Sequence, residues 1–173
     1  MSIDEMIAQR LAELDGVSLV RLSPIVGSSG TRRTLWVTEE VYNAVEPTRY
    51  GTWDDYRLSE FRGSLDAFTN NEEVSVAENP FNKDSETFLA RVSPVTKELW
   101  DVRNVTAGQG IRCLAGFAGY NSLVALTWNY RELIDDWTTF IESGETVWRS
   151  LFANLQPYSG ENLDAYLSNY ISV

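Results

Sequence analysis

Four short segments near the middle of the chain decide the fold: FLARV (88–92), LWDVR (99–103), IRCLAGF (111–117) and LVALTW (123–128). Branched and aromatic side chains are frequent in them, and proline, glycine or asparagine separate them, which is typical of β-strands. The connections are short, and sequential strands with short connections favour antiparallel pairing. The sequence therefore predicts a central four-stranded antiparallel meander over about residues 88–128.

The side chains of these strands alternate between the two faces of the predicted sheet. Trp100 and Val102 fall on one face, with Asp101 and Arg103 on the other. In the next strand, the apolar residues at odd positions share a face that is opposite to Arg112. If the second and third strands are neighbours, Arg103 and Arg112 lie side by side near the start of their hairpin.

Helical patterns precede and follow the sheet. Ser2 and Glu5 fit a capping box, and the apolar residues that follow have helical spacing up to Gly16. Two further helices are predicted between Thr38 and Pro47 and over 52–68. In the C-terminal part the pattern predicts three, over 133–141, 147–155 and 163–170, the first of them ended by Gly144.

The remaining segments are strands and connectors. Residues 17–22 and 34–37 fit two strands that could form a hairpin. The loop Gly27-Ser28-Ser29-Gly30 lacks the lysine and the spacing of a phosphate-binding P-loop, so it is interpreted as a connector. The polar stretch 70–80 is interpreted as a loop with a short strand at 74–76, and a subdomain boundary would fall there. We expect one α+β domain over residues 1–173.

Composition limits the classes of function. Hydrophobic residues make up 43% of the chain and aromatic residues 12%, which is enough to build a sizeable core. The formal net charge of −11 opposes non-specific binding to nucleic acid. Such a charge serves solubility, or it forms an acidic face for a basic partner. RNA is expected as a partner only if the few arginines cluster.

Catalysis and metal binding are limited by residue type. The chain has no histidine, which excludes Ser-His-Asp and Cys-His catalysis and histidine-ligated zinc. Cys113 is the one cysteine, so no disulfide can form within the chain, and it is expected to be a buried, inert thiol. No cofactor or metal is predicted. The acidic N-terminus and the lack of a long apolar run predict a cytoplasmic protein without a membrane partner.

Three groups of residues could form a site. Arg91, Arg103 and Arg112 could bind phosphate or carboxylate, or could each form an ion pair with a local acid such as Glu98, Asp101 or Glu132. A second group, Glu132 with Asp135 and Asp136, could hold a hard cation or form a solvated helix face. The third is aromatic, and its members fit packing better than base stacking; they are Tyr42, Tyr50, Trp53 and Tyr56.

The segments Glu98–Arg103, Ile111–Phe117 and Leu123–Leu126 resemble the central sheet of RelE/HigB-type toxins. Two helices before the sheet are also typical of that family. The resemblance implies a ribonuclease with a paired antitoxin, in which Arg103 and Arg112 are the matching site residues. Family members are usually short and basic, whereas this chain is long and acidic and has an additional helical tail.

Two functions follow as hypotheses. The first is binding of a protein partner on a RelE/HigB-like scaffold, motivated by the acidic charge. The alternative is a RelE/HigB-like ribonuclease that cleaves mRNA, with its site residues gathered on one face of the sheet. The resemblance implies Arg103 and Arg112 for the phosphate, with Tyr130 and Arg131 standing in for the family's aromatic acid/base and cation.

Overall fold

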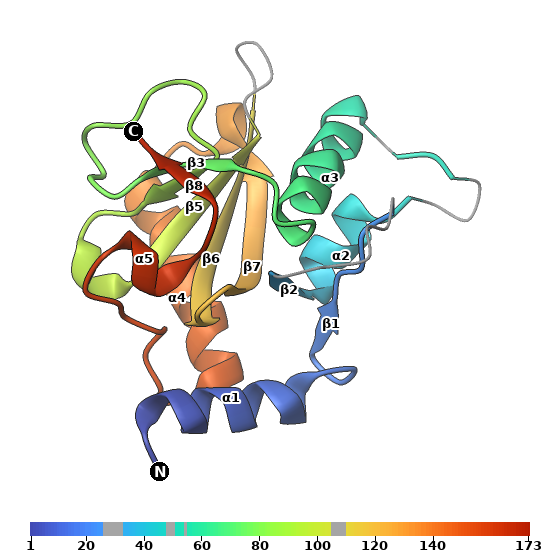
Figure 1. Cartoon of the computed structure of the whole chain (residues 1–173). Coiled ribbons are helices and arrows are strands. Elements are labelled where there is room, and N and C mark those ends of the chain that lie inside the picture. The colour runs from blue at the N-terminus through green and yellow to red at the C-terminus, as the bar shows by residue number, and fades with distance from the viewer. Residues whose placement is uncertain (26–32, 48–50, 54, 105–109) are drawn as a thin grey trace.

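A computed structural model describes residues 1–25, 33–47, 51–53, 55–104 and 110–173. The loop 27–30, and Tyr50 of the aromatic group, lie outside these residues. One mixed sheet of eight strands runs through the molecule, in the order β1-β2-β7-β6-β5-β4-β3-β8 (Figure 1). Its strands are β1 (Leu19–Arg21), β2 (Thr34–Thr38), β3 (Val74–Ala77), β4 (Leu89–Arg91), β5 (Leu99–Asn104), β6 (Ile111–Gly119), β7 (Ser122–Tyr130) and β8 (Tyr170–Ser172).

The described α-helices are α1 (Ile3–Leu14), α2 (Glu39–Val45), α3 (Tyr56–Thr69), α4 (Trp137–Phe152) and α5 (Leu163–Tyr166). Two 3-10 turns, η1 (Val95–Lys97) and η2 (Arg131–Leu133), flank the central strands. The capping box predicted for α1 is confirmed, since Ser2 N donates to Glu5 Oε2 over 2.6 Å and Glu5 N donates to Ser2 Oγ over 3.2 Å. Five described α-helices together with one mixed sheet confirm the predicted α+β class.

The prediction of a four-stranded antiparallel meander is wrong for the sheet as a whole. The strands β4 to β7 are antiparallel neighbours, but β2 adds to β7 in parallel and β3 adds to β4 in parallel. Four strands alone would leave unpaired backbone groups along both edges, on β4 and on the long β7. The added strands cover those edges, and the short β1 and β8 end the sheet. The predicted hairpin of β1 with β2 is confirmed, and the stretch 70–80 contains β3 of the same sheet.

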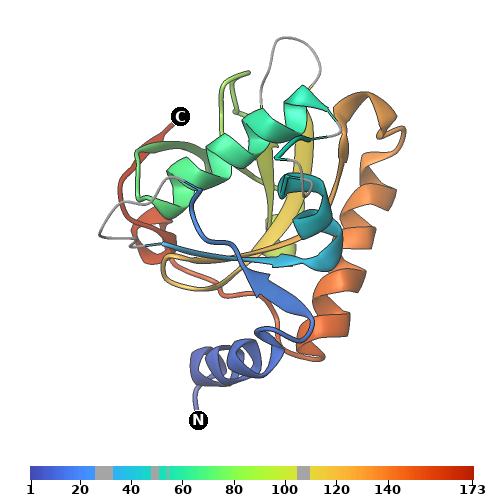
Figure 2. The ribbon, with the colours of Figure 1, turned by 90° about the vertical axis from the view of Figure 1, so that its right-hand side faces the viewer.

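Each face of the sheet carries its own apolar core. On one face, α2, α3 and α5 pack against Trp100, Cys113 and Phe117. On the opposite face, α1 and α4 pack against Leu114 and Val124. Figure 2 shows α4 (orange) and α3 (green) on different sides of the strands. The central strands are thus buried on both faces, and polar groups on them need internal partners.

The C-terminal helices differ from the prediction in two places. Gly144 does not end a helix but lies within α4, where a Cβ would come within 2.7 Å of Leu114 Cδ1. Glycine is therefore needed there for the close approach of α4 to β6 rather than for a cap. The predicted helix 163–170 ends at Tyr166, and the chain then forms β8, which pairs with β3.

The connection between the parallel strands β3 and β4 runs over the face that α4 covers. Parallel neighbours require such a crossover, because the chain must return to the same end of the sheet. Residues 78–88 make this return, and they bring Phe81 and Lys83 next to α4 and β5. Arg103 holds the crossover in place, since its Nη1 donates to the carbonyls of Asp84 (3.0 Å) and Thr87 (3.3 Å).

Candidate functional site

Arg103 and Arg112 lie directly opposite one another on β5 and β6. Both side chains project from the α4 face of the sheet, with relative exposures of 8% and 9%. Asp101 lies between them, with its Oδ2 3.7 Å from Arg103 Nε and 3.5 Å from Arg112 Nε. The two arginines thus converge as the alternation predicted, and they share one buried carboxylate.

Part of each guanidinium is committed to the fold. Arg103 Nη1 binds the crossover carbonyls, and Arg112 Nη1 donates to Ile111 O over 3.0 Å. The Nη2 atoms of both residues make no hydrogen bond within the part of the chain that the structure describes, and neither is among the fully buried unpartnered atoms. One terminal nitrogen of each arginine is therefore without a partner among the described residues.

Two more cations complete what we call the cationic cluster, which consists of Lys83, Arg103, Arg112 and Arg131 around Asp101. The charges of all four lower the pKa of Asp101. Lys83 and Arg131 are exposed, and the Arg131 guanidinium lies over the Trp137 ring, 5.2 Å from its centroid. A protein with a net charge of −11 thus gathers four of its 14 basic residues at one place.

Burial has the largest effect on the pKa of the Asp101 carboxyl. It raises the pKa of the carboxyl to about 6, which outweighs the opposite effect of Arg112, Arg103 and the other two cations. The two Nε–Oδ2 distances are long for hydrogen bonds, so the arginines stabilise the carboxylate only moderately. Burial also lowers the pKa of Arg112. The pKa of Lys83 is lowered as well, because its ammonium is partly desolvated although the residue as a whole is exposed. At pH 7 the carboxylate is largely ionised, with four positive charges around it.

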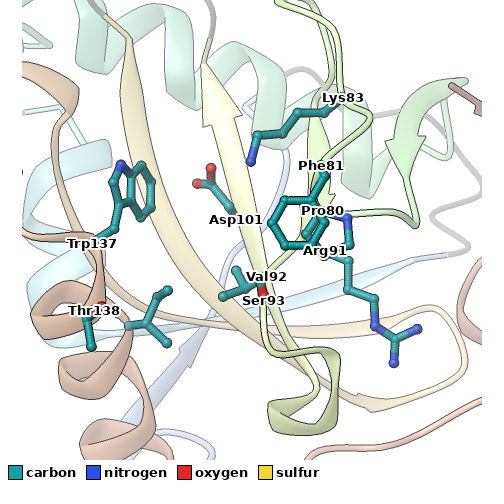
Figure 3. A pocket seen from close by; sticks show the side chains of 10 residues that line it. Pro80, Phe81, Lys83, Arg91, Val92, Ser93, Asp101, Trp137 and Thr138 are labelled. Carbon is teal, nitrogen blue, oxygen red and sulfur yellow. The ribbon is translucent and has the colours of Figure 1, made fainter.

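A pocket of about 330 Å³ opens beside the cluster, between α4 and the crossover. Figure 3 shows the Lys83 ammonium directed towards the Asp101 carboxylate, with Trp137 on one side of Asp101 and Phe81 on the other. The lining is completed by residues of the crossover, of β4 and its continuation, and of α4: Pro80, Arg91, Val92, Ser93, Thr138 and Ile141. The Asp101 Oδ1 atom is buried and has no hydrogen-bond partner among the described residues.

Tyr130 is not brought together with the arginines. It pairs with Ile111 in the β6–β7 register, and its ring packs against Trp128 on the opposite face of the sheet, with ring centroids 5.1 Å apart. The Arg57 guanidinium lies 4.0 Å from the centroid of that ring. Of the four site residues that the sequence suggested, the structure gathers Arg103, Arg112 and Arg131, and it separates Tyr130 from them by the thickness of the sheet.

The other candidate groups have local partners. Arg91 forms an ion pair with Glu98 (2.7 Å) and points away from Asp101 in Figure 3. Glu132 pairs with Arg57 over 2.6 Å, and Asp136 caps α4 by accepting from Thr138 N over 3.0 Å. Glu132 and Asp136 therefore do not share a helix face. No group of three potential metal ligands occurs in the described part of the chain.

Cys113 lies within the apolar core between β6 and the helices α2 and α3, where it is 0% exposed. Burial raises the pKa of its thiol, so it remains protonated at neutral pH. This placement agrees with the expectation of an inert thiol.

Lys83, Phe81 and Trp137 were not recognised from the sequence as site residues. Phe81 and Lys83 lie in the polar crossover, and nothing local indicates which face of the sheet it crosses. Trp137 fitted the apolar face of a helix, which is its more common use. The sequence showed only a phenylalanine and a lysine two residues apart in a polar loop, which is a weak indication of a binding site.

No family model matches the sequence, and neither a curated protein nor a solved structure is significantly similar to it. Within the described residues, no helix has the length and apolar character that crossing a membrane requires. Any function must therefore be argued from the pocket and its charges.

Proposed function

We propose that the protein binds RNA through a phosphate group at the cationic cluster, on a scaffold that resembles the RelE/HigB-type toxins. One observation carries this proposal: Arg103 and Arg112 converge with Lys83 and Arg131 around a single buried carboxylate. Guanidinium groups suit phosphate because their N–H donors match its oxygens. RNA was expected as a partner only if the arginines cluster, and three of them lie around Asp101.

The resemblance to RelE/HigB-type toxins rests on the sequence of the strands β5 to β7. Three helices, α1, α2 and α3, precede these strands, whereas two are typical of that family. Cleavage of RNA, the alternative function, would need a group that transfers protons beside the bound phosphate. Tyr130 lies on the other face of the sheet, so we propose binding and assign no cleavage step to Tyr130.

The test is binding of a short fluorescent RNA at low salt, measured by anisotropy. The variants Lys83→Glu and Arg131→Glu are expected to weaken binding at least tenfold, because each puts a negative charge where the phosphate would lie. Arg149→Glu is the matched control, since that side chain is 67% exposed and pairs with Glu145 on α4. Equal binding by the wild type and both cluster variants would refute the proposal.

Induced expression in cells separates binding from cleavage. A RelE/HigB-like ribonuclease would stop growth and fragment RNA, and the Arg112→Ala variant would not. Normal growth with intact RNA on expression of the wild type would remove the ribonuclease function and leave binding as the activity.

Binding of a protein partner is a second candidate, favoured by exposed apolar side chains around α1. Ile3 is 63% exposed, Met6 40% and Val17 81%. Ile3 and Met6 are three residues apart and therefore neighbours on the helix surface. A partner that is recovered by the wild type and lost from an Ile3→Asp, Met6→Asp variant would support this function. A partner recovered equally by both proteins would place the contact elsewhere.

A further inference from the structure

The Asp101 carboxylate forms part of the pocket wall, and one of its two oxygens is a buried acceptor without a donor among the described residues. This oxygen is Oδ1, and the residue is 3% exposed. Buried acceptors in folded proteins almost always have a donor, since leaving one unpaired costs about 1–3 kcal/mol. A ligand that offers an N–H group at this point would remove that penalty.

Lys83 supplies the complementary group. Its ammonium is directed towards Asp101 across the pocket (Figure 3), yet it forms no ion pair within 4.0 Å in the part of the chain that is described. The pocket thus offers a donor and an acceptor next to one another. Ligands that match this pair carry an acceptor and an N–H donor side by side on one edge.

The walls of the pocket suit a flat ring. Phe81 is 86% exposed and lies on one side of Asp101, and Trp137 lies on the other (Figure 3). An exposed phenylalanine beside a cationic site has no packing role of its own, because it buries little area. Aromatic side chains near cations are the usual platforms for bases of single-stranded RNA.

We infer that the pocket takes one nucleobase, whose donor–acceptor edge meets Asp101 and Lys83 and whose ring stacks on Phe81 and Trp137. This inference rests on the proposed RNA binding and names the part of the RNA that enters the pocket. The attached phosphate stays at the rim of the pocket, near the exposed Lys83 and Arg131, because the ionised Asp101 would repel it from the inner wall. The volume of about 330 Å³ is at the small end for ligand pockets and fits a single base.

The test compares nucleosides and their monophosphates with ribose 5-phosphate and inorganic phosphate by calorimetric titration of the full chain. At least one nucleoside monophosphate is expected to bind at least tenfold more tightly than ribose 5-phosphate. The Phe81→Ala variant should lose about tenfold in affinity for that nucleotide and none for ribose 5-phosphate. Phe81 is exposed, so this substitution leaves folding intact.

Two further variants complete the design. Asp101→Asn should weaken binding of the nucleotide and leave ribose 5-phosphate unaffected or bound more tightly. Tyr56→Ala is the matched aromatic control, because Tyr56 is 66% exposed at the start of α3 and away from the pocket. It should bind every compound as the wild type does.

The outcomes separate this inference from the proposed function. Equal affinity for nucleotides and ribose 5-phosphate, unchanged in Phe81→Ala, would overturn base recognition and leave phosphate binding in place. A nucleoside that binds as well as its monophosphate would support base recognition and refute the phosphate contact. Binding of none of the compounds would overturn both.

Discussion

Asp101 is a carboxylate whose ionised form is disfavoured by the folded state. Its ordinary pKa is 3.8, and burial raises the value in the fold to about 6. A folded-state pKa above the unfolded one means that the folded protein binds the proton more tightly. The resulting stability is fully present below pH 3.8, and it is lost as the pH rises through about 6.

The wild type should therefore gain stability from Asp101 when the pH falls from 7.5 to 5. One pKa unit corresponds to about 1.4 kcal/mol, and pH 5 lies about one unit below the folded-state pKa. We expect the free energy of unfolding of the wild type to rise by about 1.4 kcal/mol relative to that of Asp101→Asn over this interval. Urea unfolding of both proteins at the two pH values measures the difference.

In the difference between the wild type and Asp101→Asn, the contributions of the other titrating groups to the pH dependence of stability cancel. The carboxyls of Asp55, Glu132 and Asp136 have lowered pKa values because of hydrogen bonds to Arg57, Arg57 and Thr139, respectively. Their contributions fall away only at lower pH and are the same in both proteins. Parallel pH dependence of the wild type and Asp101→Asn would contradict the assignment of the raised pKa to Asp101.

At the residue scale, the sequence predicted Arg103, Arg112 and Arg131 and missed Lys83, Phe81 and Trp137. Strand alternation and a short hairpin are local features, so they were sufficient to place Arg103 beside Arg112. The same alternation could have placed Tyr130, because its pairing with Ile111 puts it on the opposite face. Lys83 could not be placed in this way, since its position depends on where a long crossover lies.

At the scale of elements, α4 packs directly on the sheet at two glycines. Two glycines make this possible: a Cβ on Gly116 would come within 2.8 Å of Trp148 Cζ3, and one on Gly144 within 2.7 Å of Leu114 Cδ1. Both contacts lie in the apolar core of this face. Glycine has a low helix propensity and often marks the end of a helix. For this reason the sequence predicted two helices, one on each side of Gly144, where the structure has the single helix α4.

The Gly144→Val variant should destabilise the protein by about 1–3 kcal/mol, because the added side chain must displace Leu114 or lift α4 from the sheet. Ser143→Val is the control, since Ser143 is exposed on the same helix and serine and valine have similar helix propensities. Its free energy of unfolding should change by no more than about 0.5 kcal/mol. Thermal or urea unfolding measures both. Equal effects of the two substitutions would mean that backbone propensity, rather than close packing, sets the requirement for glycine.

The edge strands show why the outer sheet was harder to predict than its centre. The segment 170–172 is short and follows a helical pattern, so local periodicity favoured continuation of the helix. Its strand conformation comes from pairing with β3, nearly 100 residues earlier in the chain. Such pairing depends on the whole fold, so it cannot be predicted from a local sequence pattern.

At the scale of the whole molecule, the cationic cluster is an exception on an acidic protein. The net charge of −11 repels every part of an RNA chain that lies outside the pocket. The cations at the rim, Lys83 and Arg131, neutralise about two phosphates. Binding should therefore depend on a short segment of RNA and gain nothing from a longer one.

A 20-nucleotide RNA should thus bind no more than about threefold more tightly than a four-nucleotide RNA of the same base composition. Two neutralised phosphates on a single strand predict a slope of about −1.4 for the logarithm of the association constant against the logarithm of salt concentration. The Lys83→Gln variant should reduce the magnitude of this slope by about half. Anisotropy titrations of both RNAs at several salt concentrations measure these values. An affinity that rises steeply with RNA length, with a slope several times larger, would require a second basic surface, which the acidic composition of this chain opposes.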